Sequence, residues 1–313
     1  MKLHAKEILK TKTVGVVCHD AGGAEMVSEW LLQESIPFCA CLAGPAEDIF
    51  QKKFTQYNKT NFDELFSQSD WILCGSSWQS DIEKKAVKRS HDLGFFVAVC
   101  LDHWVNYEDR FLSDRTLTLP SEIWVSDEYA FKLVTNLFPN TPIKVIDNPY
   151  LRRIKTELDT ARESEFSSDI DILYVCEPIK EHSKIKYGDE NFLGYTEETA
   201  LHFFFDNIHL ISSGYTRVVI RPHPSEPANK YDWAKSKNSA SLDICIGGDQ
   251  PLLSEIMRSK IVVGCESMAM VVALTAGRKV YSSIPNKGRD CVLPHEGILM
   301  MKDISLENGQ KNA

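Results

Sequence analysis

Short apolar runs alternate with amphipathic segments along almost the whole chain, and this alternation restricts the fold more than any other feature of the sequence. The runs at 13–18, 71–76 and 95–102 are rich in Val, Ile and Cys and are too short for buried helices. Between them, segments such as 24–34 place apolar residues at helical spacing. Apolar strands separated by amphipathic helices indicate a parallel sheet covered on both faces, which predicts a Rossmann-like first half.

The same pattern restarts after a polar, charged and helix-prone stretch. Further strands are predicted in the first half at 121–126 and 142–149, and in the second half at 171–178, 217–222, 242–247, 260–267 and 279–285. A chain of 313 residues exceeds the usual size of one core. We therefore predict an α/β protein with two Rossmann-like domains facing each other across a cleft: domain one at 1–150, a linker at 151–169 and domain two at 170–313.

The charge, the apolar runs and the cysteine spacing of the chain argue against several classes of function. A net charge of −9 argues against nucleic acid as the main partner, because a phosphate-tracking surface needs clustered Lys and Arg. No apolar run approaches the roughly 20 residues that span a bilayer, and the first residues form no secretory signal, so we expect a cytoplasmic protein. The nine cysteines include no CxxC pair, which favours small buried hydrophobes over a metal site or disulfides.

In the predicted first half, the stretch HDAGGAE (19–25) joins the first strand to its helix. Gly22 and Gly23 permit close approach of a ligand to the backbone, although a glycine-rich turn is equally a tight connection. His19 and Asp20 stand at the strand end, where ligands bind in doubly wound sheets. We predict Asp20 as a general base, with helix capping as the alternative role.

Two later strand ends of this half also carry polar groups. Ser76 belongs to the hydroxyl-rich GSSWQSD (75–81), where serine either binds an anion or caps the next helix. The stretch LDHWVNYEDRF (101–111) offers Asp102, His103 and Trp104. Its aromatic residues either stack on a sugar or base or anchor a loop to the core, and Asp102 is the second candidate for the base.

In the second half, the stretch RPHPSE (221–226) follows an apolar run. Its two prolines cannot continue a central strand, so we expect His223 on a stiff turn with Arg221 nearby. In GCESMAM (264–270), Glu266 and Ser267 precede a helix that opens at Met268. A hydroxyl and free amides at a helix N-terminus form an anion site, so these two strand ends together predict a phosphate site. The alternatives are a plain N-cap for Ser267 and a turn residue with a satisfied ring for His223.

These motifs resemble glycosyltransferases of the GT-B type, in particular bacterial transferases that carry a His-Pro motif, such as sialyltransferases, Kdo transferases and capsule enzymes. The match rests on His223 and Pro224, on Ser267 and Glu266 before the later helix, and on the junction VIDNPYL (145–151). The specific residues of this resemblance lie mainly in 171–285.

The resemblance implies that the second half binds a nucleotide-sugar donor, such as a CMP-activated acidic sugar, and that the first half binds a carbohydrate acceptor, with no obligatory metal or other cofactor. It gives His223 the role of stabilising the leaving phosphate while Ser267 and the helix amides hold other oxygens. Glu177 and Glu197 or Glu198 are further candidates for nucleotide or sugar contacts. An acceptor on a membrane lipid would be reached by a peripheral enzyme.

Two other functions remain open. A nucleotide-sugar 2-epimerase or hydrolase of the same architecture would use additional acids and histidines, which His19, Asp20, His103 and Glu266 could supply. A non-enzymatic two-lobed protein would instead close on a small anionic ligand without turnover. The demand for an acceptor separates the transferase from the epimerase.

Overall fold

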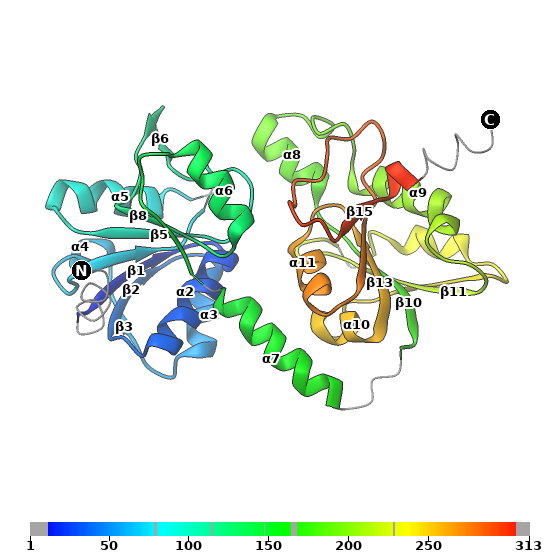
Figure 1. Ribbon diagram of the computed structural model, residues 1–313, viewed down its shortest axis with the longest axis horizontal. Helices are drawn as coiled ribbons and strands as arrows, with labels where there is room; N and C mark the ends of the chain where they lie inside the picture. Colours follow the sequence, from blue (N-terminus) through cyan, green and yellow to red (C-terminus); the bar gives the residue numbers. More distant parts are fainter. Residues whose placement is uncertain are drawn as a thin grey trace. The chain divides into compact units, whose positions relative to one another are not determined.

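The computed structural model describes residues 12–77, 80–113, 115–146, 148–163, 168–227 and 229–304. The chain divides into two compact units, unit 1 (Met1–Arg153) and unit 2 (Ile154–Ala313), each built around its own parallel sheet (Figure 1). The division falls within the helix α7 (Pro149–Glu163), which occupies most of the stretch predicted to connect the halves.

Unit 1 contains a seven-stranded sheet in the order β3-β2-β1-β4-β5-β8-β9. Its strands are β1 (Val14–Cys18), β2 (Phe38–Leu42), β3 (Asn58–Lys59), β4 (Trp71–Cys74), β5 (Val97–Leu101), β8 (Glu122–Val125) and β9 (Ile143–Val145). Its helices before α7 are α2 (Ala21–Glu34), α3 (Pro45–Lys53), α4 (Phe62–Leu65), α5 (Ile82–Leu93) and α6 (Glu128–Leu137). A short antiparallel hairpin joins β6 (Leu112–Ser113) to β7 (Thr116–Leu117).

Unit 2 contains a six-stranded sheet in the order β12-β11-β10-β13-β14-β15. Its strands are β10 (Ile170–Val175), β11 (Thr216–Arg221), β12 (Leu242–Ile246), β13 (Ser259–Gly264), β14 (Lys279–Ser282) and β15 (Ile298–Met300). Its α-helices are α8 (Ile179–Tyr187), α9 (Glu197–Asn207), α10 (Leu252–Arg258) and α11 (Met268–Thr275), with short 3-10 turns at Ile208–Leu210 and Asp232–Lys237.

Both sheets are wound in the same way. In unit 1 the chain starts at β1, continues on one side through β2 and returns to the other side at β4, so β1 pairs with both. In unit 2, β10 takes the same place between β11 and β13. The point where the winding reverses, between β1 and β4 or between β10 and β13, is where loops from neighbouring strands diverge and ligands bind in such sheets.

The strands form because their side chains are buried on both faces of the sheets. All five residues of β1 and of β5 are buried, and a cluster around Trp71 and Trp124 fills the core of unit 1. Tyr174 and Phe204 belong to the corresponding cluster in unit 2. All nine cysteines are free thiols, and those of the central strands are buried, as their positions in apolar runs predicted.

The doubly wound α/β architecture of both halves is confirmed, and each predicted strand lies on or beside an observed one. The missed elements include α3, α4, α8 and β15, together with the two-residue strands β3, β6 and β7. The prediction that 279–285 forms the last strand is wrong, since β15 pairs beyond β14. Only Ile298 of β15 is buried, so this edge strand has no apolar run to reveal it. Within the described residues, no helix is long and apolar enough to cross a membrane.

Candidate functional site

At the end of β1, His19 and Asp20 form a side-chain pair. His19 Nδ1 lies 2.6 Å from Asp20 Oδ1. Because an ionised carboxylate only accepts hydrogen bonds, Nδ1 is the donor, and in the neutral ring the lone pair is on Nε2. The Nε2 edge lies against Gly44, where an added Cβ would come within 2.8 Å of that nitrogen. Asp20 occupies the N-cap position of α2 but makes no capping hydrogen bond, so its carboxylate orients the imidazole instead.

A buried glutamate on the helix that follows the neighbouring strand β4 supports this pair. Glu83, at the start of α5, accepts the backbone N–H of His19 at 2.8 Å through Oε1. The carboxyl is buried, and among the described residues its Oε2 has no hydrogen-bond partner. Burial raises the pKa of Glu83 to about 7, because the ionised form loses hydration that two backbone N–H groups replace only in part.

Asp102, at the end of β5, is held in an ion pair. Arg110 Nη1 donates to Asp102 Oδ1 at 2.7 Å and to the carbonyl oxygen of Ser76 at 3.1 Å, while Ser76 Oγ lies 3.2 Å from the same carboxylate oxygen. Gly22 makes room for the carboxylate, since an added Cβ would lie 1.9 Å from Asp102 Oδ2. The Asp102 carboxylate is therefore held by contacts within unit 1.

The remaining first-half candidates serve packing. Trp104 is buried, and its indole N–H donates to both carboxylate oxygens of Asp127, which also caps α6. His103 Nδ1 accepts the backbone N–H of Trp104 at 3.0 Å. Gly23 lets α2 approach the loop after β4, since an added Cβ would lie 3.0 Å from Gly75 Cα. Trp104 therefore anchors its loop to the core rather than offering a stacking face.

In unit 2, the two prolines end β11 as expected, and His223 stands on a hydrogen-bonded turn. Its Nδ1 accepts the backbone N–H of Ser225 at 3.2 Å and lies 2.8 Å from Ser225 Oγ. In the neutral ring Nε2 therefore carries the hydrogen. Burial lowers the pKa of His223, which keeps the ring neutral near pH 7. The turn thus presents a fixed N–H donor at a strand end, with Pro224 exposed beside it.

A buried carboxylate fixes the other end of this turn. Glu226 accepts the backbone N–H of His223 at 2.9 Å, Lys230 Nζ at 2.7 Å and the hydroxyl of Tyr231 at 2.8 Å. Arg221 is directed elsewhere, since its Nη1 donates to Glu255 at 2.6 Å and to a backbone carbonyl. Arg221 therefore stabilises the base of the loop and is not gathered with His223.

Glu177, which follows β10, accepts hydrogen bonds from backbone N–H groups at the end of β13. Its Oε1 accepts the backbone N–H groups of Glu266 at 2.8 Å and of Cys265 at 3.2 Å. Burial and the nearby Glu266 carboxylate raise the pKa of Glu177 to about 8. Burial also raises the pKa of Glu266, whose carboxylate accepts a hydrogen bond from Arg289. Two carboxyls with raised pKa therefore meet at the switch point of unit 2.

Ser267 caps α11, as one of its predicted roles required. Its Oγ accepts the backbone N–H of Ala269 at 3.2 Å, and the helix begins at Met268. Part of the expected anion site is thus filled from within the chain, by Glu177 at the loop amides and by Ser267 at the first turn. The same holds at α9, where Thr196 forms a capping box with Thr199.

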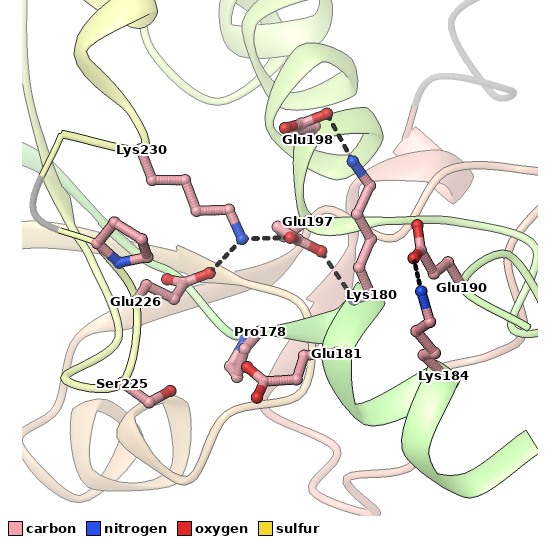
Figure 2. Close-up of a pocket in the computed structure, with 11 residues that line it drawn as sticks. Pro178, Lys180, Glu181, Lys184, Glu190, Glu197, Glu198, Ser225, Glu226 and Lys230 are labelled. Atoms are coloured by element: carbon pink, nitrogen blue, oxygen red, sulfur yellow. Dashed lines mark hydrogen bonds and ion pairs between the residues drawn. The ribbon is translucent and has the colours of Figure 1, made fainter. Parts of the chain in front are cut away.

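A pocket of about 320 Å³ lies beside the His223 turn. Ser225 and Glu226 of that turn line it together with Lys180 on α8 and Glu197 at the start of α9 (Figure 2). Sequence reasoning singled out Glu197 and Glu198 but missed Lys180 and Lys230, because lysines on exposed helices and loops carry no local pattern. Glu83 and Arg110 were missed for a similar reason, since only the fold brings them to distant strand ends.

Among the described residues, no group of three or more His, Cys, Asp or Glu side chains is arranged to hold a metal ion. No protein-family model matches the chain, and no curated protein matches it in sequence. Solved structures do match its fold. The UDP-GlcNAc 2-epimerase of Methanocaldococcus jannaschii, in complex with UDP-GlcNAc and UDP, superposes with a TM-score of 0.61 at 11% identity, over 96% of this chain and 92% of that chain.

Two further structures extend this likeness. A putative UDP-N-acetylglucosamine 2-epimerase from Listeria monocytogenes gives a TM-score of 0.62 at 10% identity, over 96% of this chain and 87% of the other. MurG from Acinetobacter baumannii gives 0.53 at 10% identity, over 96% and 90%. The fold is GT-B-like. At these identities the likeness establishes the architecture, and the side chains described above must carry any statement about chemistry.

Proposed function

We propose that the chain is a glycosyltransferase that binds a nucleotide-activated sugar in unit 2 and transfers the sugar to a carbohydrate or lipid-linked acceptor in surface-polysaccharide synthesis. The observation that carries this proposal is the His223 turn, where Nδ1 is occupied by Ser225 and Nε2 retains its hydrogen. A neutral imidazole held this way donates a hydrogen bond from Nε2 to a phosphate oxygen, and the hydrogen stays on the ring. The resemblance to His-Pro transferases and the GT-B-like fold support the same role.

In the proposed reaction, the acceptor hydroxyl oxygen bonds to the anomeric carbon of the donor sugar while the bond from that carbon to the nucleotide phosphate oxygen breaks. The leaving phosphate keeps the electron pair, and His223 Nε2–H donates to it, which lowers the energy of the charge that develops. Ser267 and the backbone N–H of Met268 are proposed to contact its other oxygens. Glu177 and Glu266 contribute by holding the loop before α11.

Unit 1 is proposed to bind the acceptor and to supply the base. His19 is better suited than Asp20, because Asp20 accepts from Nδ1 and leaves the Nε2 lone pair to take the hydroxyl proton. Asp20 then stabilises the imidazolium that forms. Asp102 is assigned a structural role through its ion pair with Arg110.

The test is a thermal-shift panel of CMP, CDP, UMP, UDP and GDP on the wild type, on His223→Ala and on His209→Ala. His209 is an exposed histidine of the same unit and serves as the matched control. A nucleotide at 100 times its dissociation constant stabilises the fold by about 2.7 kcal/mol. One nucleotide should stabilise the wild type and the control but not His223→Ala. Equal stabilisation of all three proteins, or of none, would contradict the proposed phosphate role of His223.

A nucleotide-sugar 2-epimerase is the second candidate, and one observation favours it. Epimerisation removes a proton from carbon and returns one, so it needs carboxyls that exchange protons near neutral pH. Glu83 and Glu177 have pKa values raised to about 7 and about 8. Incubation with UDP-N-acetylglucosamine in D₂O without acceptor separates the two functions: deuterium at C2 of the product identifies an epimerase, and its absence, with sugar transfer when acceptor is added, identifies a transferase.

A further inference from the structure

The pocket beside the His223 turn contains a balanced set of ion pairs on its α8 side. Lys180 Nζ donates to Glu198 at 3.0 Å, and Lys184 Nζ donates to Glu190 at 2.7 Å (Figure 2). Both lysines and both glutamates line the pocket. Each ammonium group is therefore already neutralised by a neighbouring carboxylate.

The opposite side of the pocket is richer in carboxylates. Lys230 is shared between Glu226 and Glu197, and Glu197 also accepts the backbone N–H of Lys180 at 2.9 Å. Glu181 adds a further carboxylate to the lining. The lining then holds three ammonium groups and five carboxylates, a net charge of −2 (3 − 5). The nearby His182 and His223 add no charge near pH 7, because burial lowers the pKa of each.

This lining suits a ligand that carries hydroxyl groups and no net negative charge. Ammonium groups donate and carboxylates accept, so a polyol, whose hydroxyls do both, finds partners of both kinds. An anion would face an excess of like charge at close range in a partly enclosed site, which is how binding sites reject a competitor. The volume of about 320 Å³ lies near the lower end of the range for small-molecule pockets, roughly 300 to 1,000 Å³, and fits one sugar ring better than a whole nucleotide sugar.

An aromatic pair lies at the end of α8 and in the segment after it, outside the residues that line the pocket. Tyr187 and Phe192 are stacked with ring centroids 3.9 Å apart and planes 13° apart, and both are exposed. Tyr187 follows Lys184 by three residues on α8, which places the two on one face of the helix. The Lys184–Glu190 ion pair holds the segment that carries both rings.

We propose that this pocket binds the sugar of the donor and that this sugar is uncharged, a hexose or N-acetylhexosamine rather than an acidic sugar. The inference rests on the proposed function for the identity of the donor. It reverses the expectation, drawn from the resemblance, that the donor carries an acidic sugar. Glu181 sets the sign of this selection, since it lines the pocket and, among the described residues, forms no ion pair with an ammonium group.

The first arm of the test examines the pocket without any nucleotide. Saturation-transfer NMR compares methyl α-glucoside with methyl α-glucuronoside, which differ only in the carboxylate at C6, on the wild type, on Glu181→Lys and on Glu296→Lys. Glu296 is exposed, does not line the pocket and receives the same change of charge. The wild type and the Glu296→Lys control should favour the glucoside about tenfold, and Glu181→Lys should reduce that preference several-fold. Equal or tighter binding of the glucuronoside to the wild type, or no binding of either sugar, overturns the inference.

The second arm separates this inference from the proposed function. Titration calorimetry compares UDP with UDP-glucose and UDP-glucuronic acid, and CMP with CMP-N-acetylneuraminic acid. Loss of nucleotide binding in His223→Ala supports the proposed function whichever sugar is preferred. Tighter binding of UDP-glucose than of UDP or UDP-glucuronic acid supports the uncharged sugar, whereas CMP-N-acetylneuraminic acid binding more tightly than CMP overturns it and leaves the phosphate role of His223 intact.

Discussion

At each of the two switch points, a carboxyl group accepts hydrogen bonds from backbone N–H groups of a neighbouring loop. The two carboxyl groups reach in opposite directions along the chain. In unit 1, Glu83 reaches from the helix after β4 back to the loop after β1 and accepts from His19. In unit 2, Glu177 reaches from the loop after β10 forward to the loop after β13 and accepts from Cys265 and Glu266. The unit 1 arrangement leaves a histidine at the strand end, whereas the unit 2 arrangement occupies two of the backbone N–H groups before α11.

The carboxyls around these bridges also differ in how they are neutralised. Next to the unit 1 bridge, Asp102 is paired with a buried arginine, Arg110. In unit 2, Glu266 is paired with the more exposed Arg289, and Glu177 has its pKa raised to about 8. The arginine next to the bridge is therefore buried in unit 1 and more exposed in unit 2, whereas the bridging carboxyl has a raised pKa in both units. Proton-holding carboxyls at a switch point are what acid–base chemistry requires, and a fixed ion pair is what rigidity requires.

The largest expected effect comes from removing the two arginines. Arg110→Met leaves Asp102 partly buried without its cation, so we expect the free energy of unfolding to fall by about 3 to 5 kcal/mol. Arg289→Met should lower it by about 1 kcal/mol, because solvent screens a side chain that is 36% exposed. Urea denaturation followed by circular dichroism measures the free energy of unfolding of both variants. Equal losses of stability in the two variants would show that the buried Arg110 and the more exposed Arg289 do not differ in this way.

The second effect is a dependence of stability on pH. The folded-state pKa of Glu83, about 7, lies above its unfolded value, so its contribution to stability is complete below about pH 4.5 and is lost as the pH rises through 7. The shift corresponds to roughly 3 kcal/mol. Glu83→Gln should therefore lose less stability than the wild type between pH 5 and pH 8. Tryptophan fluorescence follows this change in unit 1, which holds all of the tryptophans except Trp233.

Glu177→Gln provides the matching measurement in unit 2. Its raised pKa predicts the same sign, with loss of stability continuing to about pH 8. If the pH profile of either variant parallels that of the wild type, the corresponding carboxyl is ionised throughout and the comparison fails for that unit.

A smaller effect is expected at Gly22. Because an added Cβ would lie 1.9 Å from Asp102 Oδ2, Gly22→Ala should force the carboxylate away from Arg110 and lower the free energy of unfolding by about 1 to 3 kcal/mol. A double-mutant cycle with Asp102→Ala identifies the cause. The second substitution removes the clashing atom, so Gly22→Ala should have almost no effect in its presence. An undiminished effect would assign the loss to the helix backbone.

The smallest effect compares helix caps. Ser267→Ala and Thr196→Ala each remove a side-chain cap and should lower the free energy of unfolding by about 1 kcal/mol. Asp20→Ala should lower it less, since Asp20 makes no capping hydrogen bond, yet it should reduce turnover by loosening His19. A loss of stability at Asp20 as large as that at Ser267 would show that Asp20 caps α2 and would weaken its role in orienting the imidazole.

The sequence predicted the sheets because apolar runs such as 14–18 and 262–264 are buried, and repeated short runs of this kind between amphipathic helices indicate parallel sheets. It located the strand ends that carry His19, His223 and Ser267 for the same reason. It could not predict that Glu83 or Arg110 would reach those ends, because a single charged residue on a helix shows no pattern. Nor could it distinguish Trp104 as an anchor from Trp104 as a stacking platform, since that depends on the distant Asp127.

The buried cysteine thiols report the opening of each unit separately. Cys74 on β4 and Cys265 after β13 lie beside the two switch points, and burial raises the pKa of both, so neither reacts while its sheet stays closed. The rate of alkylation at either position therefore reports how often that sheet opens. Mass spectrometry of a chain labelled for increasing times would read two opening rates from one sample, and a ligand held by unit 2 would slow only the second of them.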